Sequence, residues 1–315
     1  MRPNFCYMGR VRFLRCHLRR GANHYPKEHS ALSAPRHTTP AAAGREPAGF
    51  DFKHAATVLT DVAARAGAAI MRRYREPGAV SLKDDRSPVT RADQDSEAIV
   101  LEALAALAPD VHVVSEESYA GGTTPLPDRF FLVDPLDGTK EFIQKRSDFT
   151  INIALIEHGR PSFGLVYAPG RARMALTIAP GMAIETDLAP DSVGADLGRL
   201  SQRPLRARTP RAGGLTALVS HSHLDPDTET FLTKLEIAER WGIGSSLKFI
   251  AIAKGEADVY PRFAPTMEWD TAAGQAVLEA AGGSVVDAHG LPLRYGKADR
   301  DLRNPSFIAW GARQD

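Results

Sequence analysis

An apolar run that stops at two acids is the strongest constraint in this chain. The stretch FFLVDPLDGT, residues 130–139, places Asp134 and Asp137 directly after four apolar residues. A short, continuous apolar run is typical of a strand that is buried on both faces of a sheet. A turn is one interpretation of the residues after this run, because Asp, Pro and Gly all favour turns. A carboxylate site at the strand end is the other, and the rest of the chain has to decide between them.

The composition indicates an ordinary globular protein. The chain has 315 residues, 43% of them hydrophobic, and a formal net charge of +1, which suits one large or two ordinary domains. We expect no nucleic-acid partner. No apolar stretch approaches the roughly 18 residues of a membrane span, although peripheral membrane association stays open. The sequence leaves the oligomeric state open as well.

Both cysteines, Cys6 and Cys16, lie in the first twenty residues. The body of the chain therefore has no thiol chemistry, which excludes cysteine catalysis there and fits a reducing compartment. We accordingly expect a cytoplasmic protein.

The first 48 residues differ from the rest. They are rich in Ala and Pro, have no acid before Glu28, and carry arginines at positions 2, 10, 12, 15, 19 and 20. An organelle transit peptide, a disordered arm and an over-extended translation start all fit this composition. We predict a disordered tail over residues 1–48 with no catalytic role.

From residue 51 onward the hydrophobic pattern becomes regular and predicts alternating helices and strands. Apolar residues at helical spacing predict helices over 51–75 and 91–108. VHVVSEES and FFLVDPLDGT predict two strands that end in acids, and residues 149–170 predict a hairpin. The Pro- and Arg-rich residues 188–214 indicate a crossing between two lobes, 49–190 and 191–315. In the second lobe we expect strands near 215–220, 257–263, 284–287 and 306–310, and helices near 226–240, 245–254 and 269–282.

Acids recur at the ends of four of these segments. They are Asp93, the pair Glu116 and Glu117, the pair Asp134 and Asp137, and Asp270. Side chains at element ends can converge from distant parts of a sequence, and hard oxygen ligands suit Mg²⁺. A helix that begins after Asp137, at Gly138 and Thr139, would aim backbone N–H groups at an anion. Together these features predict metal-assisted phosphoryl transfer to water.

The blocks SPVTRADQ, SEES, DPLDGTKEF and WDTAA, in this order, resemble the signature of the inositol monophosphatase superfamily, the lithium-sensitive, Mg²⁺-dependent phosphatases. The resemblance covers about residues 50–312. Within the superfamily, residues 244–274 are especially similar to the 3′(2′),5′-bisphosphate nucleotidases of the CysQ type. The resemblance implies an α/β fold, a layered α-β-α-β-α sandwich. Its N-terminal lobe would hold the metals, and its C-terminal lobe would close over the substrate.

The resemblance also implies a metal site. Glu116, Asp134 and the carbonyl of Leu136 would hold one Mg²⁺, while Asp134, Asp137 and Asp270 would hold a second. Asp93 and Thr139 would orient the attacking water together with Glu116, and a third ion near Asp93 stays open. Of the two neighbouring glutamates we favour Glu116, and leave open whether Glu117 shares its role.

The same resemblance names residues for substrate binding. They are Lys83, Gly138, Thr139, His223, Ser245, Lys248, Arg262 and Asp270. Alternatively, Lys83 is an ordinary surface residue, and His223 is a residue that caps a helix. Simple inositol phosphatases commonly carry an acid where this chain has Arg262. Because a guanidinium suits phosphate, we prefer a nucleotide with a second phosphate as the substrate.

The sequence therefore predicts a Mg²⁺-dependent nucleotidase that removes the 3′-phosphate of adenosine 3′,5′-bisphosphate in sulfur assimilation, with its sulfated precursor as a further substrate left open. The alternative is an inositol or inositol-polyphosphate phosphatase. A non-catalytic nucleotide- or RNA-binding regulator on the same scaffold is the third interpretation, and the intact set of acids argues against it.

Overall fold

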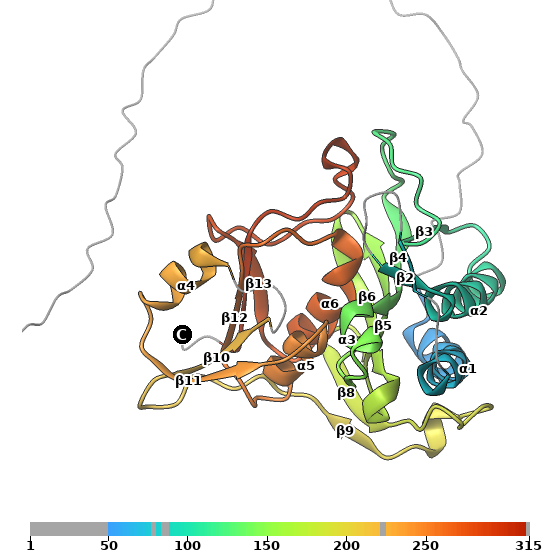
Figure 1. The fold of residues 1–315 in the computed structure, drawn as a ribbon, viewed down its shortest axis with the longest axis horizontal. Coiled ribbons are helices and arrows are strands. Elements are labelled where there is room, and N and C mark those ends of the chain that lie inside the picture. The colour runs from blue at the N-terminus through green and yellow to red at the C-terminus, as the bar shows by residue number, and fades with distance from the viewer. Residues whose placement is uncertain (1–49, 77–79, 83–87, 221–224, 313–315) are drawn as a thin grey trace, which may run out of the picture. The chain divides into compact units, whose positions relative to one another are not determined.

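The computed structural model describes residues 50–76, 80–82, 88–220 and 225–312 (Figure 1). The chain divides after Ala48, and Gly49–Asp315 forms one compact unit. Lys83, His223 and the tail of residues 1–48 lie outside the described residues. No helix in the described ranges is long and apolar enough to cross a membrane.

Two long helices form the first layer. In α1 (Phe52–Arg75) the residues Leu59, Val62 and Ile70 lie on one buried stripe, and the carboxylate of Asp51 caps the helix by accepting the N–H of His54. The short strands β1 (Val80–Leu82) and β2 (Pro88–Thr90) pair antiparallel and lead into α2 (Arg91–Leu107). The helices expected at 51–75 and 91–108 are confirmed.

The second layer is a seven-stranded sheet in chain order. Its strands are β3 (His112–Ser115), β4 (Arg129–Asp137), β5 (Thr150–Glu157), β6 (Arg160–Ala168), β7 (Arg173–Ala179), β8 (Met182–Asp187) and β9 (Gln202–Pro204). Only β3 and β4 run parallel; the other neighbours are antiparallel. Helix α3 (Thr139–Ile143) follows β4, and the 3₁₀ helices η1 (Pro169–Arg171) and η2 (Leu197–Arg199) lie in later connections.

Strand β4 has both faces buried, as its apolar run predicts. Phe131 and Val133 pack with residues of α1 and α2, whereas Phe130 and Leu132 pack with the core formed by α5 (Leu247–Ala253) and α6 (Ala272–Ala280). The alternation follows from the two-residue period of a strand. The sheet is thus enclosed between two pairs of helices (Figure 1).

A five-stranded mixed sheet covers the other side of α5 and α6. Its order is β11 (Ile237–Gly242), β10 (Leu215–Val219), β12 (Val259–Arg262), β14 (Phe307–Trp310) and β13 (Ser284–Asp287). Helix α4 (Pro226–Leu232) packs on its outer face through Leu232. The 3₁₀ helices η3 (Glu268–Asp270) and η4 (Ala298–Arg300) complete the fold. The layers alternate α-β-α-β-α, so the predicted fold class is confirmed.

One predicted element is wrong. The helix expected over 226–240 ends at Leu232, and residues 237–242 form strand β11. The helix was predicted because the apolar residues Leu232, Leu235 and Ala238 recur at helical spacing. Parallel pairing of β11 with β10 outweighs that local preference, since Ile237 lies opposite Leu215 and Trp241 opposite Leu218.

Candidate active site

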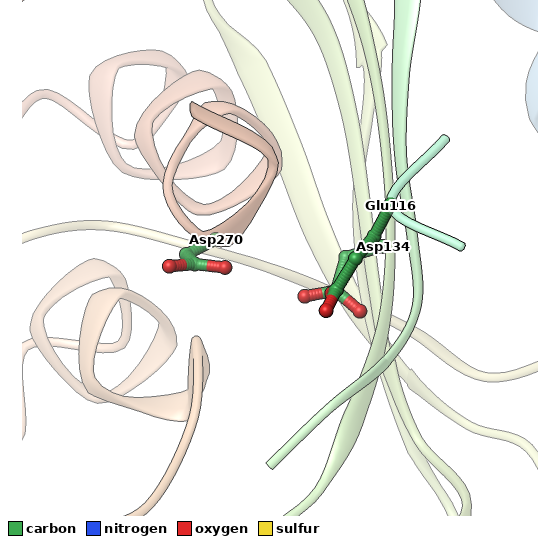
Figure 2. Close-up of side chains that lie close together, drawn as sticks. All are labelled: Glu116, Asp134 and Asp270. Atoms are coloured by element: carbon green, nitrogen blue, oxygen red, sulfur yellow. The ribbon is translucent and has the colours of Figure 1, made fainter. Parts of the chain in front are cut away.

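Three carboxylates from distant parts of the sequence converge. Glu116 follows β3, Asp134 lies within β4, and Asp270 ends η3. One carboxylate oxygen from each lies within 4.8 Å of the other two. Figure 2 shows Asp270 approaching from the side opposite to Glu116 and Asp134. Of the two neighbouring glutamates, Glu116 is the one that joins this cluster.

The like charges raise the proton affinity of the cluster. Burial raises the pKa of Asp134 well above its usual range, and the nearby charges of Glu116, Asp137 and Asp270 raise it further. Burial and the charge of Asp137 likewise raise the pKa of Asp270. Buried charges of one sign are stable only when they are compensated. An oxygen-only set of this kind fits a hard divalent cation such as Mg²⁺.

Asp137, the fourth predicted acid, is held by the turn before α5. Its Oδ2 accepts the Ser245 hydroxyl at 2.5 Å, the Ser246 N–H at 2.8 Å and the Ser246 hydroxyl at 3.1 Å. The amide of Asn152 lies 3.4 Å from the same oxygen. Asp137 is therefore oriented by residues that are distant in the sequence.

Asp93 and Thr139, both predicted site residues, contact each other. Asp93 is buried in the first turn of α2, and the Thr139 hydroxyl lies 3.3 Å from Asp93 Oδ1 and 3.3 Å from the carbonyl oxygen of Leu136. Gly138 caps α3 with φ +93°, a conformation that favours glycine. A Cβ at this position would lie 3.0 Å from the carbonyl oxygen of Asp148.

Two buried cations, Lys248 and Arg262, line the same pocket as Glu116 and Asp270. We call the cations the cationic end of the pocket and the three clustered carboxylates its acidic end. Lys248 is 4% exposed and donates to the carbonyl oxygens of Ser245 at 2.6 Å and Ile243 at 3.2 Å. Arg262 is 8% exposed and donates to the carbonyl oxygens of Ala264 and Pro265. Burial lowers the pKa of Lys248 to about 8, although the charge of Asp137 opposes this shift. Among the described residues, neither cation forms an ion pair with a carboxylate.

The two ends share one cavity of about 330 Å³. Predicted residues in its lining are Glu116, Asp137, Gly138, Thr139, Ser245, Lys248, Arg262 and Asp270. The lining also includes Tyr260 and Trp269, which the sequence reasoning did not name. Asp93, Asp134 and Leu136 are not among the lining residues. Asp134 belongs to the cluster of three carboxylates, and Thr139 contacts both Asp93 and Leu136.

The sequence reasoning missed the polar residues that support the site. Asp148, Thr150, Asn152 and Ser246 are all buried and contact the turn or the acids around it. Their signal was present in DFTINIALIE, where three polar residues alternate at the start of an apolar strand. Alternating residues of a strand lie on one face, so three buried polar groups share a direction.

Comparisons with known proteins agree with this geometry. Residues 51–312 match the profile described as "Inositol monophosphatase family". The chain is 43% identical over 253 residues to the protein named 3′(2′),5′-bisphosphate nucleotidase CysQ of Escherichia coli (strain K12), a match that spans 79% of this chain and 96% of that protein. A protein of the same name from Salmonella typhimurium is 42% identical over 253 residues, with the same coverage.

A solved structure is similar too. The crystal structure of CysQ from Bacteroides thetaiotaomicron, described as a bacterial member of the inositol monophosphatase family, superposes with a TM-score of 0.69. The match has 36% sequence identity and covers 84% of this chain and 99% of that one.

Proposed function

Because the chain belongs to the inositol monophosphatase family, we propose that it removes the 3′-phosphate of adenosine 3′,5′-bisphosphate and yields AMP and phosphate. This is the activity of a 3′(2′),5′-bisphosphate nucleotidase, the name that its relatives at 43% identity carry. The observation that supports a substrate with two phosphates is the pair of buried cations, Lys248 and Arg262, which line the same pocket as Glu116 and Asp270.

The acidic end would hold the metal. Glu116, Asp134 and Asp270 offer converging oxygens, and Asp137 and the carbonyl of Leu136 are the further ligands we assign. We propose two Mg²⁺ ions, with Asp134 shared between them, and leave open a third near Asp93. When bound, the ions would neutralise charge on the phosphoryl group and lower the pKa of water.

Asp93 and Thr139 would orient the attacking water. The Thr139 hydroxyl lies 3.3 Å from Asp93 Oδ1, so it can accept a hydrogen bond from water while its own proton points to the carboxylate. Water would attack phosphorus and give one proton to the Asp93 carboxylate through the Thr139 hydroxyl. The bond from phosphorus to the ribose 3′-oxygen would break, and that oxygen would take one proton from solvent water, so that one water is consumed for each AMP and phosphate formed. Gly138 and Thr139 line the same pocket, and their backbone N–H groups would help to bind the transferred phosphate.

The cationic end would hold the phosphate that does not react. A guanidinium and an ammonium that are buried without ion-pair partners among the described residues need an anion for compensation. A 5′-phosphate supplies that charge. The chain's own carbonyl oxygens already orient both side chains, so little ordering is left for binding. Ser245, at the same end of the pocket, and His223, outside the described residues, complete the proposed substrate contacts, as does Lys83.

In the cell, this reaction would clear an inhibitory by-product of sulfur assimilation, and we propose a cytoplasmic location for it. The partner of the protein is then a small-molecule phosphate ester. Sensitivity to lithium follows from family membership.

A side-by-side assay tests the proposal. Phosphate release is measured from adenosine 3′,5′-bisphosphate and from inositol 1-phosphate, each with and without Mg²⁺. We expect Mg²⁺-dependent release and a much higher kcat/KM for the nucleotide. A preference for inositol 1-phosphate would favour the inositol phosphatase alternative, and no release from either would leave a binding protein.

A further inference from the structure

Three alternating side chains at the start of β5 contact three successive residues of the second half of the chain. Asp148 Oδ2 accepts the N–H of Gly244 at 3.2 Å. Thr150 Oγ1 lies 2.5 Å from the hydroxyl oxygen of Ser245. The amide of Asn152 donates to the hydroxyl oxygen of Ser246 at 2.9 Å. We call these three contacts the β5 ladder.

The β5 ladder fixes the turn before α5 from several sides. Arg171 donates to Asp148 Oδ1 at 2.5 and 3.1 Å, which braces the first contact. Thr150 also lies 3.0 Å from Asn152 Oδ1, so the ladder residues contact each other. Ser245 has φ +54°, an uncommon conformation for a residue with a side chain. Such a conformation persists where its surroundings hold it.

The hydroxyl of Ser246 lies between two acids that come from different halves of the fold. It is 3.1 Å from the carboxylate oxygen of Asp137 in β4 and 2.8 Å from the backbone carbonyl oxygen of Asp270 in η3. Ser246 is 1% exposed, so water does not compete for these bonds. Because Asn152 donates to this hydroxyl, the single hydroxyl proton of Ser246 points toward Asp137 or Asp270.

We infer that Ser246 and Asn152 are positioning residues that set the spacing between Asp137 and Asp270 and thereby the affinity of the metal site. The inference shares one assumption with the proposed function, namely that Asp137 and Asp270 are metal ligands. The donors on Asp137 all reach Oδ2, which leaves Oδ1 for an ion. Hydrogen bonds that orient a ligating carboxylate typically change metal affinity about 10- to 100-fold when they are removed.

The same turn leads to the cationic end of the pocket. Lys248 donates to the carbonyl oxygen of Ser245, one residue before Ser246. A shift of residues 244–246 would therefore move a proposed metal ligand and a proposed phosphate contact together. Occupancy of the metal site and binding of the second phosphate are then coupled through one turn.

The test measures Mn²⁺ binding to the substrate-free protein by electron paramagnetic resonance, because Mn²⁺ takes the same oxygen ligands as Mg²⁺. We expect Ser246→Ala to raise the dissociation constant of Mn²⁺ about tenfold or more, and Ser246→Thr, which keeps the hydroxyl, to restore it. At saturating metal, kcat of Ser246→Ala should return to within about threefold of wild type, because positioning and not chemistry is lost.

The variant Asn152→Ala tests the same inference a second time without changing Ser246. If both residues act through one chain of hydrogen bonds, the double variant should bind Mn²⁺ no more weakly than Ser246→Ala alone. The matched control is Ser162→Ala in β6, which removes a hydroxyl of the same sheet that bonds the carbonyl oxygen of Leu155, away from the ladder. It should bind Mn²⁺ like wild type, and a thermal melt of each variant reports whether it is folded.

Folded Ser246→Ala and Asn152→Ala variants that bind Mn²⁺ as tightly as wild type would overturn this inference while leaving the proposed function intact. Independent, multiplying effects of the two substitutions would also overturn it. A wild-type protein that binds no Mn²⁺ would overturn both the metal assignment and the role of Ser246.

Discussion

The two ends of the active-site pocket are opposite in charge and differ in burial, because both cations are buried whereas Asp134 is the buried one of the three clustered acids. At one end Glu116, Asp134 and Asp270 place carboxylate oxygens within 4.8 Å of one another. At the other end Lys248 and Arg262 lie buried and, among the described residues, have no ion-pair partner. Placing like charges close together away from water costs free energy, so each end favours a ligand of the opposite charge. We propose a division of labour in which the acidic end binds metal cations for the reaction and the cationic end binds the second phosphate.

The largest expected effect concerns the acidic end. Asp134→Asn should abolish turnover of every substrate, because the substitution removes the charge at the centre of the cluster. The folded protein should gain stability in the absence of metal, since a buried carboxylate among like charges is replaced by a neutral amide. Phosphate release and thermal melts with and without Mg²⁺ measure both effects. Wild-type activity in this variant would remove the acidic end from the mechanism.

A substitution at the cationic end should lower kcat/KM only for substrates that carry a second phosphate. Charge-assisted contacts are typically worth about 1.5–3 kcal/mol, so Arg262→Ala should lower kcat/KM for adenosine 3′,5′-bisphosphate roughly 10- to 100-fold. Adenosine 3′-monophosphate, which carries only the scissile phosphate, should be hydrolysed almost as by wild type. Equal losses on the two substrates would contradict the division of labour.

The pH dependence of kcat/KM tests the role of the cationic end in a second way. The pKa of Lys248 is lowered to about 8 by burial, so its ammonium is charged below this pH and is lost above it. Asp137, Glu141 and Asp148 favour the charged form, and Arg262 opposes it. We expect kcat/KM for the bisphosphate to fall about fivefold between pH 8 and pH 9, relative to kcat/KM for the 3′-monophosphate.

Lys248→Arg is the matched control for this pH effect, since it keeps a charge over the whole range. The extra loss for the bisphosphate above pH 8 should disappear in this variant. If the ratio between the two substrates is flat with pH in the wild type, the ammonium of Lys248 does not bind the second phosphate.

The smallest effect is expected from the tail. A chain that begins at Ala48 keeps every residue of both ends of the pocket, because the compact unit starts at Gly49. We expect kcat and KM within about twofold of the full chain. A folded, shortened protein with a large loss of kcat would show that the tail contributes to the site.

Much of the fold follows from local patterns. The stripe of α1 and the apolar run of β4 define their elements without knowledge of tertiary structure. Strand β11 could not be predicted in this way, because its exposed residues become a strand only by pairing with β10. The hairpin of β7 and β8 went unnoticed, although Pro180 and Gly181 mark a turn between two apolar runs.

The site residues also fall into those that could be predicted from the sequence and those that could not. Acids at element ends, together with the resemblance to known signatures, led to Glu116, Asp134 and Asp270, which the structure brings together. The contact of Thr150 with Ser245 and that of Asn152 with Ser246 join residues about 95 positions apart. No local spacing indicates such partners. The acids that we propose as metal ligands could therefore be found from the sequence, whereas the residues that orient Asp137 required the fold.

The products formed from adenosine 3′,5′-bisphosphate test the division of labour most directly. Phosphorus NMR distinguishes the 3′- and 5′-monophosphates, so it shows which phosphate lies at the acidic end during turnover. The wild-type protein with Mg²⁺ should release one equivalent of phosphate and leave adenosine 5′-monophosphate. Accumulation of adenosine 3′-monophosphate, or of a mixture of the two, would contradict the assignment of the second phosphate to Lys248 and Arg262.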